Sequence, residues 1–370
     1  MTVRDVHDIL NAWAPKETAW ERDNVGLQVG SMARRVRTIL VALDMTDEVL
    51  AEARDKKVDL IVTHHPLLFH PAGKVTLDDR VGRLVYRLAE SGIALYSAHT
   101  NLDAARGGVS FALAGRLRLQ EPEFLEQDRR EMKKIAVFVP PDHVDAVMAA
   151  MAAAGAGTLG KYEMCSFRVG GTGTFRPAKG AKPFTGAVGT LEATDEVRLE
   201  MILPAWRLHD VVAAMRKAHP YEEVAYDAYD LSNPGGMAGL GVIGNLAEAM
   251  PLSKFLAHVK RALRVPSVRY SGPMRRSIRR VAACGGSGSG LMATAIRRGA
   301  DAFVTADVTY HQFQECDGRL ALIDAGHWET EEPVIPGIVG RLQSNVRGGR
   351  DRVKVLQSRR MKNFVQYYTS

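Results

Sequence analysis

The segment IVTHHPLLFHP (61–71) contains two adjacent histidines, His64 and His65. Neighbouring residues on a β-strand point to opposite faces of the sheet, so both imidazoles can serve one site only where the strand ends and the chain turns. Pro66 favours such an end, because proline lacks a backbone N–H and biases the preceding residue toward an extended conformation. The pair is a candidate set of metal ligands, although adjacent histidines alone are as often ordinary surface or core residues.

A second polar segment, SAHTNLDAARGG (97–108), also follows an apolar run and supplies His99 and Asp103. Open α/β sheets bind ligands at the carboxyl ends of their parallel strands, where such segments meet. Asp103 is therefore a candidate carboxylate partner for the two imidazoles. The alternative is structural, because Asp103 also suits the N-cap of a helix formed by ARGGVSFAL (105–113), and taken alone this is the more frequent role.

The segment LIDAGHWETEEPVIP (322–336) places His327 and Glu331 four residues apart after a third strand-like run. Positions i and i+4 share one face of a helix, so an imidazole and a carboxylate there can bind one cation together. This spacing alone is weak evidence for a metal site. The evidence is stronger here because the two residues follow a strand-like run, as the other candidate ligands do. Glu329 and Glu332 are predicted to face solvent in the first helical turn, where negative charge is favourable.

Together these segments predict a metal centre formed by three imidazoles and two carboxylates: His64, His65, Asp103, His327 and Glu331. Five ligands exceed the four of a tetrahedral zinc and are about half of the first shells of two divalent cations. Two such cations would leave net positive charge beside two carboxylates, which favours hydroxide or a small anionic substrate such as phosphate. Nitrogen and oxygen ligands without thiolate suit Zn, Fe, Mn, Co or Ni alike.

The glycine-rich turn CGGSGSG (284–290) follows a strand-like run and precedes a helix-like one, a geometry in which backbone amides can bind an anion. Its glycines do not have the GxGxxG spacing, and the chain has no GxxxxGK[ST] motif, so a dinucleotide or P-loop site is not indicated. The CGGSGSG sequence is equally compatible with a turn that lines a pocket and with a tight turn that has no contact with a ligand. The chain also lacks a GxSxG motif, which makes a serine hydrolase improbable.

Apolar runs alternate with amphipathic segments in the first and last thirds of the chain. Strand-like runs occupy 37–44, 58–65 and 93–99, then 279–285, 301–307 and 321–327, and helix-like segments occupy 47–57, 78–92 and 291–300. Runs that are apolar throughout and separated by helices predict largely parallel sheets covered on both faces. The predicted fold class is therefore α/β, with two α/β halves that form one host domain.

The middle of the chain has a different order, β-α-β-β-α-β. A strand-like run (134–140), a helix-like segment (142–156), short strands to about residue 203, a second helix-like segment (205–218) and a last strand-like run (222–231) follow one another. This is the split ferredoxin-like α+β pattern. If the middle segment is a domain inserted into the host domain, the two flanking halves can share the alternation of strand-like and helix-like segments that the middle segment lacks. The predicted boundaries are 1–132 and 233–370 for the host and 133–232 for the insert.

Composition limits the function classes. The chain has 370 residues and 49 Lys and Arg against 42 Asp and Glu, but its net charge of +7 is spread in short groups, so nucleic-acid binding is not expected. Three distant cysteines, Cys165, Cys284 and Cys316, support neither a disulfide framework nor a cysteine-rich zinc site and fit a reducing compartment. The charged start of the chain and the short apolar stretch at 144–157 predict no signal peptide or membrane span, hence a cytoplasmic protein.

These motifs resemble the NIF-three-like dinuclear-metal-centre family, also called the GTP cyclohydrolase 1 type 2 homologues. The matching segments occur in order along the host halves: DNVGLQVG (23–30), VALDMT (41–46), IVTHHPLLF (61–69), AHTNLDAARGG (98–108), ACGGSGSG (283–290), TADVTYHQ (305–312) and DAGHWETE (324–331). The middle, with KYEMCSFRVGGTGTF (161–175) and HPYEEVAYDAYDL (219–231), resembles the PII-like insert of longer members. Ala306 and Arg106 depart from the commoner Gly and Pro, and neither disturbs a ligand.

The resemblance implies a two-metal site with the five ligands named above, in which Glu331 bridges the ions. It also implies a homo-oligomer, a hexamer built as a dimer of trimers, with metal sites that face an interior cavity. His311 in TYHQ is expected near the site, with a structural role equally compatible, and Asn101 is treated in the same way. His311 and His99 are the candidate proton carriers.

Two functions fit this pattern. The first is a metal-dependent hydrolase that acts on a phosphoester or nucleotide-type substrate through a hydroxide between two cations. The GTP cyclohydrolase name would require attack on a purine ring, and no guanine-binding pocket is identifiable in the sequence. The alternative is a non-enzymatic protein that stores or delivers metal, or a regulatory scaffold that acts through its insert.

Overall fold

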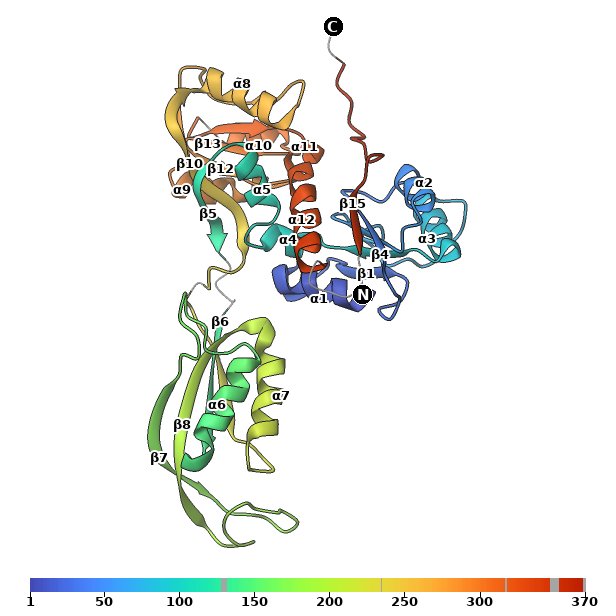
Figure 1. Ribbon diagram of the computed structural model, residues 1–370. Helices are drawn as coiled ribbons and strands as arrows, with labels where there is room; N and C mark the ends of the chain where they lie inside the picture. Colours follow the sequence, from blue (N-terminus) through green and yellow to red (C-terminus); the bar gives the residue numbers. More distant parts are fainter. Residues whose placement is uncertain (128–131, 234, 317, 347–352, 369–370) are drawn as a thin grey trace. The chain divides into compact units, whose positions relative to one another are not determined.

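A computed structural model describes residues 1–127, 132–233, 235–316, 318–346 and 353–368 (Figure 1). The chain forms two compact units, one from residues 1–126 with 237–370 and the other from residues 127–236. The second unit is a few residues longer at each end than the predicted insert. The strands that flank it, β5 (Gln120–Gln127) and β10 (Gly239–Pro251), are neighbours in one sheet of the first unit. The insert therefore leaves and returns at nearly the same place, as an inserted domain requires.

The first sheet of the host unit has the strand order β1-β4-β3-β2-β15, parallel throughout except for β1, which runs antiparallel to β4. Alternate residues of β2 face opposite layers: Ile39 packs in a core with α1 and α12, and Leu40 packs in a core with α2 and α3. The elements are α1 (Val3–Trp13), β1 (Gly26–Val29), β2 (Thr38–Ala42), α2 (Asp47–Asp55), β3 (Leu60–Thr63), α3 (Arg80–Ser91), β4 (Ala94–Ser97), α12 (Ile335–Val346) and β15 (Lys354–Gln357).

The second sheet of the host unit has the order β11-β14-β13-β12-β10-β5, in which β12, β13 and β14 are parallel, β10 is antiparallel to β12, and β11 is antiparallel to β14. Val281 faces a core with α5 and α8, and Ala282 faces a core with α9. The remaining elements are α4 (Thr100–Ala104), α5 (Val109–Arg116), α8 (Leu252–Leu263), β11 (Arg269–Tyr270), β12 (Ser277–Ala283), α9 (Met292–Arg297), β13 (Ala302–Thr305), α10 (Tyr310–Glu315), β14 (Ala321–Asp324) and α11 (His327–Glu331).

The predicted α/β class is confirmed, because both host sheets have a parallel centre and helices on both faces. The sequence analysis assigned no element to β15 or to α8. β15 extends the first sheet beside β2, although it follows the whole second half along the chain. No helix among the described residues has the length and apolar character needed to cross a membrane.

The second unit is a four-stranded antiparallel sheet in the order β7-β8-β6-β9, with α6 and α7 on one face (Figure 1). Its core joins the inner face of the sheet to both helices through residues such as Val137, Met151, Leu199 and Met215. The element order β-α-β-β-α-β is the one predicted from the sequence. The elements are β6 (Met132–Val139), α6 (Val144–Ala153), β7 (Phe167–Phe175), β8 (Glu192–Pro204), α7 (Leu208–Ala218) and β9 (Tyr226–Asp230).

Candidate metal centre

The two adjacent histidines follow β3 directly, where the strand ends as predicted. The backbone N–H groups of His64 and His65 donate to the carbonyls of Ala42 and Leu43, and the Thr63 hydroxyl donates to the carbonyl of His65. The turn brings the two rings to the same side, with 4.9 Å between their centroids. Both imidazoles can therefore serve one site, which a continuous strand would not allow.

The Glu331 carboxylate joins the two host sheets at this point. Its Oε2 lies 2.9 Å from Nε2 of His65 and 3.2 Å from Nε2 of His327, which stands one helical turn earlier on α11. Its Oε1 lies 3.8 Å from Nε2 of His64, and that nitrogen is 3.6 Å from Oδ1 of Asp103. The structure thus brings together all five side chains that the sequence analysis selected.

Several of these atoms are buried without a hydrogen bond. Among the described residues, Nε2 of His64, Oδ1 of Asp103 and Oε2 of Glu331 have no hydrogen-bond partner. Nε2 of His64 lies 3.6 Å from Asp103 and 3.8 Å from Glu331, and Oε2 of Glu331 has its ion-pair contacts with His65 and His327. An unpaired buried polar atom is costly, and three that converge on one place fit a bound cation. Two triads have ligand atoms within 4.8 Å of one another, His64 with His65 and His99, and His65 with His327 and Glu331. The residues present therefore fit a metal centre.

Each inward-facing imidazole is oriented by an oxygen at its other nitrogen. Nδ1 of His65 donates to Asp44 at 2.8 Å, Nδ1 of His327 donates to Asp307 at 2.6 Å, and Nδ1 of His64 donates to the carbonyl of Ala98 at 2.8 Å. These oxygens only accept, so each ring keeps a proton on Nδ1, and it is Nε2 that loses its proton and faces the centre when a cation binds. Neither Asp44 nor Asp307 was expected to contact the site. The available signal was a carboxylate directly after a strand, in VALDMT and in TADVTYHQ.

His99 lies at the edge of the same cluster. Its ring centroid is 5.2 Å from that of His64, and its Nδ1 donates to Asp23 at 2.9 Å. Burial opposes ionisation of Asp23, but hydrogen bonds from His99 and Thr100 outweigh it and hold the pKa of this carboxyl well below its usual range. Asn101 has a structural role, because its side chain donates to the carbonyl of Ala14 and accepts from the N–H of His99.

Electrostatics in the cluster are dominated by Glu331. Burial alone would raise the pKa of Glu331, but the surrounding imidazoles lower it well below its usual value. Burial lowers the pKa of His65, and contacts with Asp44 and Glu331 overcome this effect and raise it to about 10. The contact with Glu331 raises the pKa of His327 to about 9. Burial raises the pKa of Asp103. Without metal, positive imidazoles therefore compensate the buried carboxylate.

The glycine-rich turn at 284–290 packs against Glu331. Gly286 has φ of +59°, and a Cβ at this position would overlap Oε1 of Glu331. Its N–H donates to the hydroxyl of Thr330 at 3.0 Å. The thiol of Cys284, two residues earlier, is partly buried, and burial raises its pKa to about 12, so it is protonated in the metal-free protein. The turn therefore lines the centre and fixes the position of its central carboxylate.

Two structural expectations were wrong. Asp103 is not a helix N-cap: it lies within α4, and Gly108 occupies the N-cap of α5. Glu329 does not face solvent: it is 6% exposed and accepts a hydrogen bond from Asn363, because the C-terminal segment covers it, and burial raises its pKa. Glu332 is half-buried and pairs with Arg116.

His311 is exposed on α10, and its ring contacts that of Tyr310. No contact between His311 and the five clustered side chains is found among the described residues. Asp307, earlier in the same segment, instead contacts His327. His99 is therefore the better placed of the two candidate proton carriers.

Comparison with known proteins gives consistent matches over nearly the whole chain. Residues 1–363 match the model of the family Duf34/NIF3 (NGG1p interacting factor 3). A protein of Halalkalibacterium halodurans named GTP cyclohydrolase 1 type 2 homolog is 40% identical over 356 residues, which cover 95% of each chain. A Bacillus subtilis protein of the same name is 40% identical over 343 residues, 92% of each chain. The crystal structure of a Bacillus cereus protein related to NIF3 is similar with TM-score 0.86 and 39% identity, covering 100% of this chain and 99% of the other.

Proposed function

The chain belongs to the Duf34/NIF3 family, and from this premise we propose that it is a dinuclear metal protein that hydrolyses a phosphoester or nucleotide-type substrate. The observation that carries the proposal is the convergence of three buried, unpaired atoms, Nε2 of His64, Oδ1 of Asp103 and Oε2 of Glu331. Protein interiors rarely leave such atoms unpaired without a ligand.

The five clustered side chains divide naturally between two ions. Glu331 directs one oxygen toward His64 and the other toward His65 and His327, which suits a bridging carboxylate. Asp103 stands beside His64 and would complete the first of the two positions. When bound, two divalent cations supply Lewis acidity and lower the pKa of a water held between them. Zn, Fe, Mn, Co and Ni all suit this set of donors.

The chain's own groups would orient the substrate and move its proton. His99, held by Asp23, has its second ring nitrogen available to accept a proton from the attacking water and return it to the leaving group. Asp44 and Asp307 keep His65 and His327 in fixed orientations throughout.

The test combines metal analysis with turnover. Elemental analysis of the purified protein should find two transition-metal ions per chain, and the metal-loaded protein should hydrolyse members of a phosphoester panel that includes bis(p-nitrophenyl) phosphate and GTP. His64→Ala and Glu331→Ala should abolish both readouts, whereas His209→Ala, which removes a histidine that is 96% exposed in the second unit, should change neither. Activity that survives both site variants would be contamination and would contradict the proposal.

A non-enzymatic role is the alternative outcome of this test. Two bound ions without turnover on any substrate would favour metal storage, metal delivery or a regulatory scaffold. Transfer of metal from the loaded protein to an apo-metalloenzyme, faster than the spontaneous loss of metal to a chelator, would then identify delivery.

We also propose, from family membership, that the protein forms a homo-hexamer built as a dimer of trimers and acts in the cytoplasm. Light scattering coupled to size-exclusion chromatography should give six times the chain mass of 40.5 kDa. A monomeric or dimeric mass would contradict this assembly without affecting the metal proposal.

A further inference from the structure

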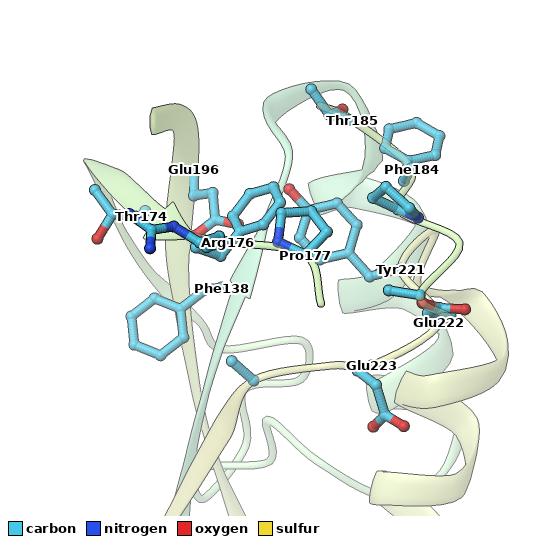
Figure 2. Close-up of a pocket in the computed structure, with 15 residues that line it drawn as sticks. Phe138, Thr174, Arg176, Pro177, Phe184, Thr185, Glu196, Tyr221, Glu222 and Glu223 are labelled. Atoms are coloured by element: carbon cyan, nitrogen blue, oxygen red, sulfur yellow. The ribbon is translucent and has the colours of Figure 1, made fainter. Parts of the chain in front are cut away.

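The second unit contains a cavity of about 520 Å³ that is formed entirely by its own residues (Figure 2). Its walls come from β6, from the end of β7 with the loop after it, from β8, and from the turn before β9. The volume is within the range of small-molecule sites. None of the residues of the candidate metal centre lines it.

Aromatic rings form much of the cavity wall. Tyr221 is central, with its ring centroid 5.9 Å from that of Phe184 and 6.4 Å from that of Phe175, and Phe138 lines the cavity from β6. The Tyr221 ring is tilted by 45° from that of Phe184 and by 53° from that of Phe175. Figure 2 shows Pro177 beside Tyr221, with Phe138 and Phe184 on different sides. Several ring faces around one cavity are a favourable environment for a cation.

Hydrogen bonds hold the walls in place without a ligand. His219 donates from Nε2 to the carbonyl of Phe138 at 3.0 Å and accepts the N–H of Tyr221 at Nδ1, so one neutral imidazole ties the Tyr221 turn to β6. Burial lowers the pKa of His219, which keeps the ring neutral. The Glu222 carboxylate accepts the backbone N–H of Lys182 at 2.6 Å and ties the same turn to the loop after β7. The cavity is therefore preformed.

The charged groups of the wall are mainly acidic. Three acidic residues, Glu196, Glu222 and Glu223, are among the residues that line the cavity, and Arg176 is the one basic residue among them. Glu196 occupies space that only a glycine at position 173 leaves open, because a Cβ there would overlap its carboxylate. These groups give the wall a formal charge near −2 and favour a positively charged ligand.

The Tyr221 hydroxyl is also available to a ligand. It is buried and makes no well-aligned hydrogen bond among the described residues, and the carboxylate of Glu196 is the polar group with which it interacts. Burial, together with the neighbouring Glu196 carboxylate, raises the pKa of Tyr221 to about 12, so the hydroxyl remains a neutral donor and acceptor at physiological pH. A buried hydroxyl and a carboxylate on the wall of one aromatic cavity are both available to a polar, positively charged ligand.

We propose that this cavity binds a small organic cation, an amine or quaternary ammonium group carried on an apolar or aromatic body. The charged group lies against the faces of Tyr221 and Phe184 and near the carboxylate of Glu196, and the apolar body contacts Phe138 and Pro177. The proposal is independent of the metal centre, because every residue that it uses belongs to the second unit.

The test uses three probes of similar size and different charge on the full chain: benzyltrimethylammonium, 2-phenylethanol and phenylacetate, each titrated by isothermal calorimetry. We expect saturable binding of the cation and at least about tenfold weaker binding of the neutral and anionic probes. Equal or tighter binding of phenylacetate, or no saturable binding of benzyltrimethylammonium, would overturn the proposal.

Variants locate the binding. Glu196→Gln removes one charge at nearly constant shape, and Phe184→Ala removes a ring that is 55% exposed, so neither should unfold the unit. Each substitution should weaken the binding of benzyltrimethylammonium about tenfold. Asp195→Asn removes the same charge from the neighbouring exposed position of β8 and should leave the affinity within about twofold. An equal loss in Asp195→Asn and Glu196→Gln would show a nonspecific charge effect and refute the site.

Discussion

Oε2 of Glu331 lies 2.9 Å from Nε2 of His65, although the two residues come from different sheets at opposite ends of the host sequence. His65 ends β3 of the first sheet, and Glu331 ends the short helix that follows β14 of the second. Correct folding of both halves is therefore a condition for the site. The contact also makes Glu331 the residue on which the arrangement of the cluster depends most.

Replacing that carboxylate should remove the bridge between the two proposed metal positions. We expect Glu331→Gln to lower bound metal from two ions per chain to one or none, since an amide cannot serve two cations as a carboxylate does. Inductively coupled plasma mass spectrometry after gel filtration measures the number of metal ions bound per chain. Glu332→Gln, at the adjacent half-buried position, is the matched control and should retain both ions. Full metal content in Glu331→Gln would contradict its bridging role.

The carboxylates that accept hydrogen bonds from the ligand imidazoles should contribute to metal affinity nearly as much as the imidazoles themselves. Asp44→Asn weakens the hydrogen bond that orients His65 and should reduce metal affinity about 10- to 100-fold, measured by competition with a chromogenic chelator. Asp78→Asn, at an exposed position of the same half, should have no effect. An affinity within twofold of the parent for Asp44→Asn would exclude Asp44 from this role.

The glycine-rich turn offers an unusually well-matched pair of variants. Gly286→Ala introduces a Cβ at positive φ that would overlap Oε1 of Glu331, so it should cost about 1–2 kcal/mol of stability and weaken metal binding. Gly290→Ala, four residues later, has no positive φ and no heavy atom within 4 Å of the added Cβ, and should be neutral in both respects. Thermal unfolding and chelator competition measure the two effects. Identical behaviour of the variants would refute the packing argument.

Metal binding should release protons. In the metal-free protein the pKa values of His65 and His327 are about 10 and about 9, so both rings are protonated at pH 7.5 and must lose a proton before Nε2 can bind a cation. Metal affinity should therefore rise as pH increases from 6.5 to about 9. Calorimetry in buffers of different ionisation enthalpy counts the protons, and we expect between one and two per chain. Binding without proton release would contradict this charge state.

Glu52 should make stability depend on acid pH. It is 2% exposed and accepts hydrogen bonds from Ser358, Arg359 and Arg360, which together with Lys56 outweigh its burial and lower its pKa from 4.5 to about 2. A lowered pKa in the folded state stabilises the protein above pH 4.5, and this stabilisation is lost as pH falls toward 2.

Chemical denaturation of the parent and Glu52→Gln proteins measures the effect. The difference should be about 2 kcal/mol at pH 6 and should shrink toward zero near pH 2. Glu90→Gln, at an exposed position of α3, is the control and should show no such trend. A constant difference between the parent and Glu52→Gln at all pH values would indicate a packing effect instead of a charge effect.

Local sequence was sufficient to select the five clustered side chains, because each follows a strand-like run and the carboxyl ends of neighbouring parallel strands meet at one edge. Pro66 indicated the end of β3, and the spacing of His327 and Glu331 indicated a shared helix face. The pattern could not predict which edges of the two sheets would face each other. That relationship depends on tertiary packing between the two halves.

The burial of Glu329 and the roles of Asp44 and Asp307 were not predicted, and all three depend on contacts between residues distant in sequence. Glu329 has the sequence of a solvated first-turn residue, but Asn363 covers it from a segment for which no structure was predicted. Asp44 and Asp307 follow strands in the same way as the selected residues, but their partners, His65 and His327, lie about 20 positions away. Periodicity describes an element and its faces, and it carries no information on which side chain an element will meet.

The position of β15 has a consequence for biosynthesis. This strand pairs with β2, yet the ribosome makes it only after the second unit and the whole second sheet. Until then the nascent chain carries β2 with one edge unpaired, and exposed strand edges promote association with other chains. We therefore expect the first half to need protection by chaperones during translation, and chains released before residue 354 to aggregate.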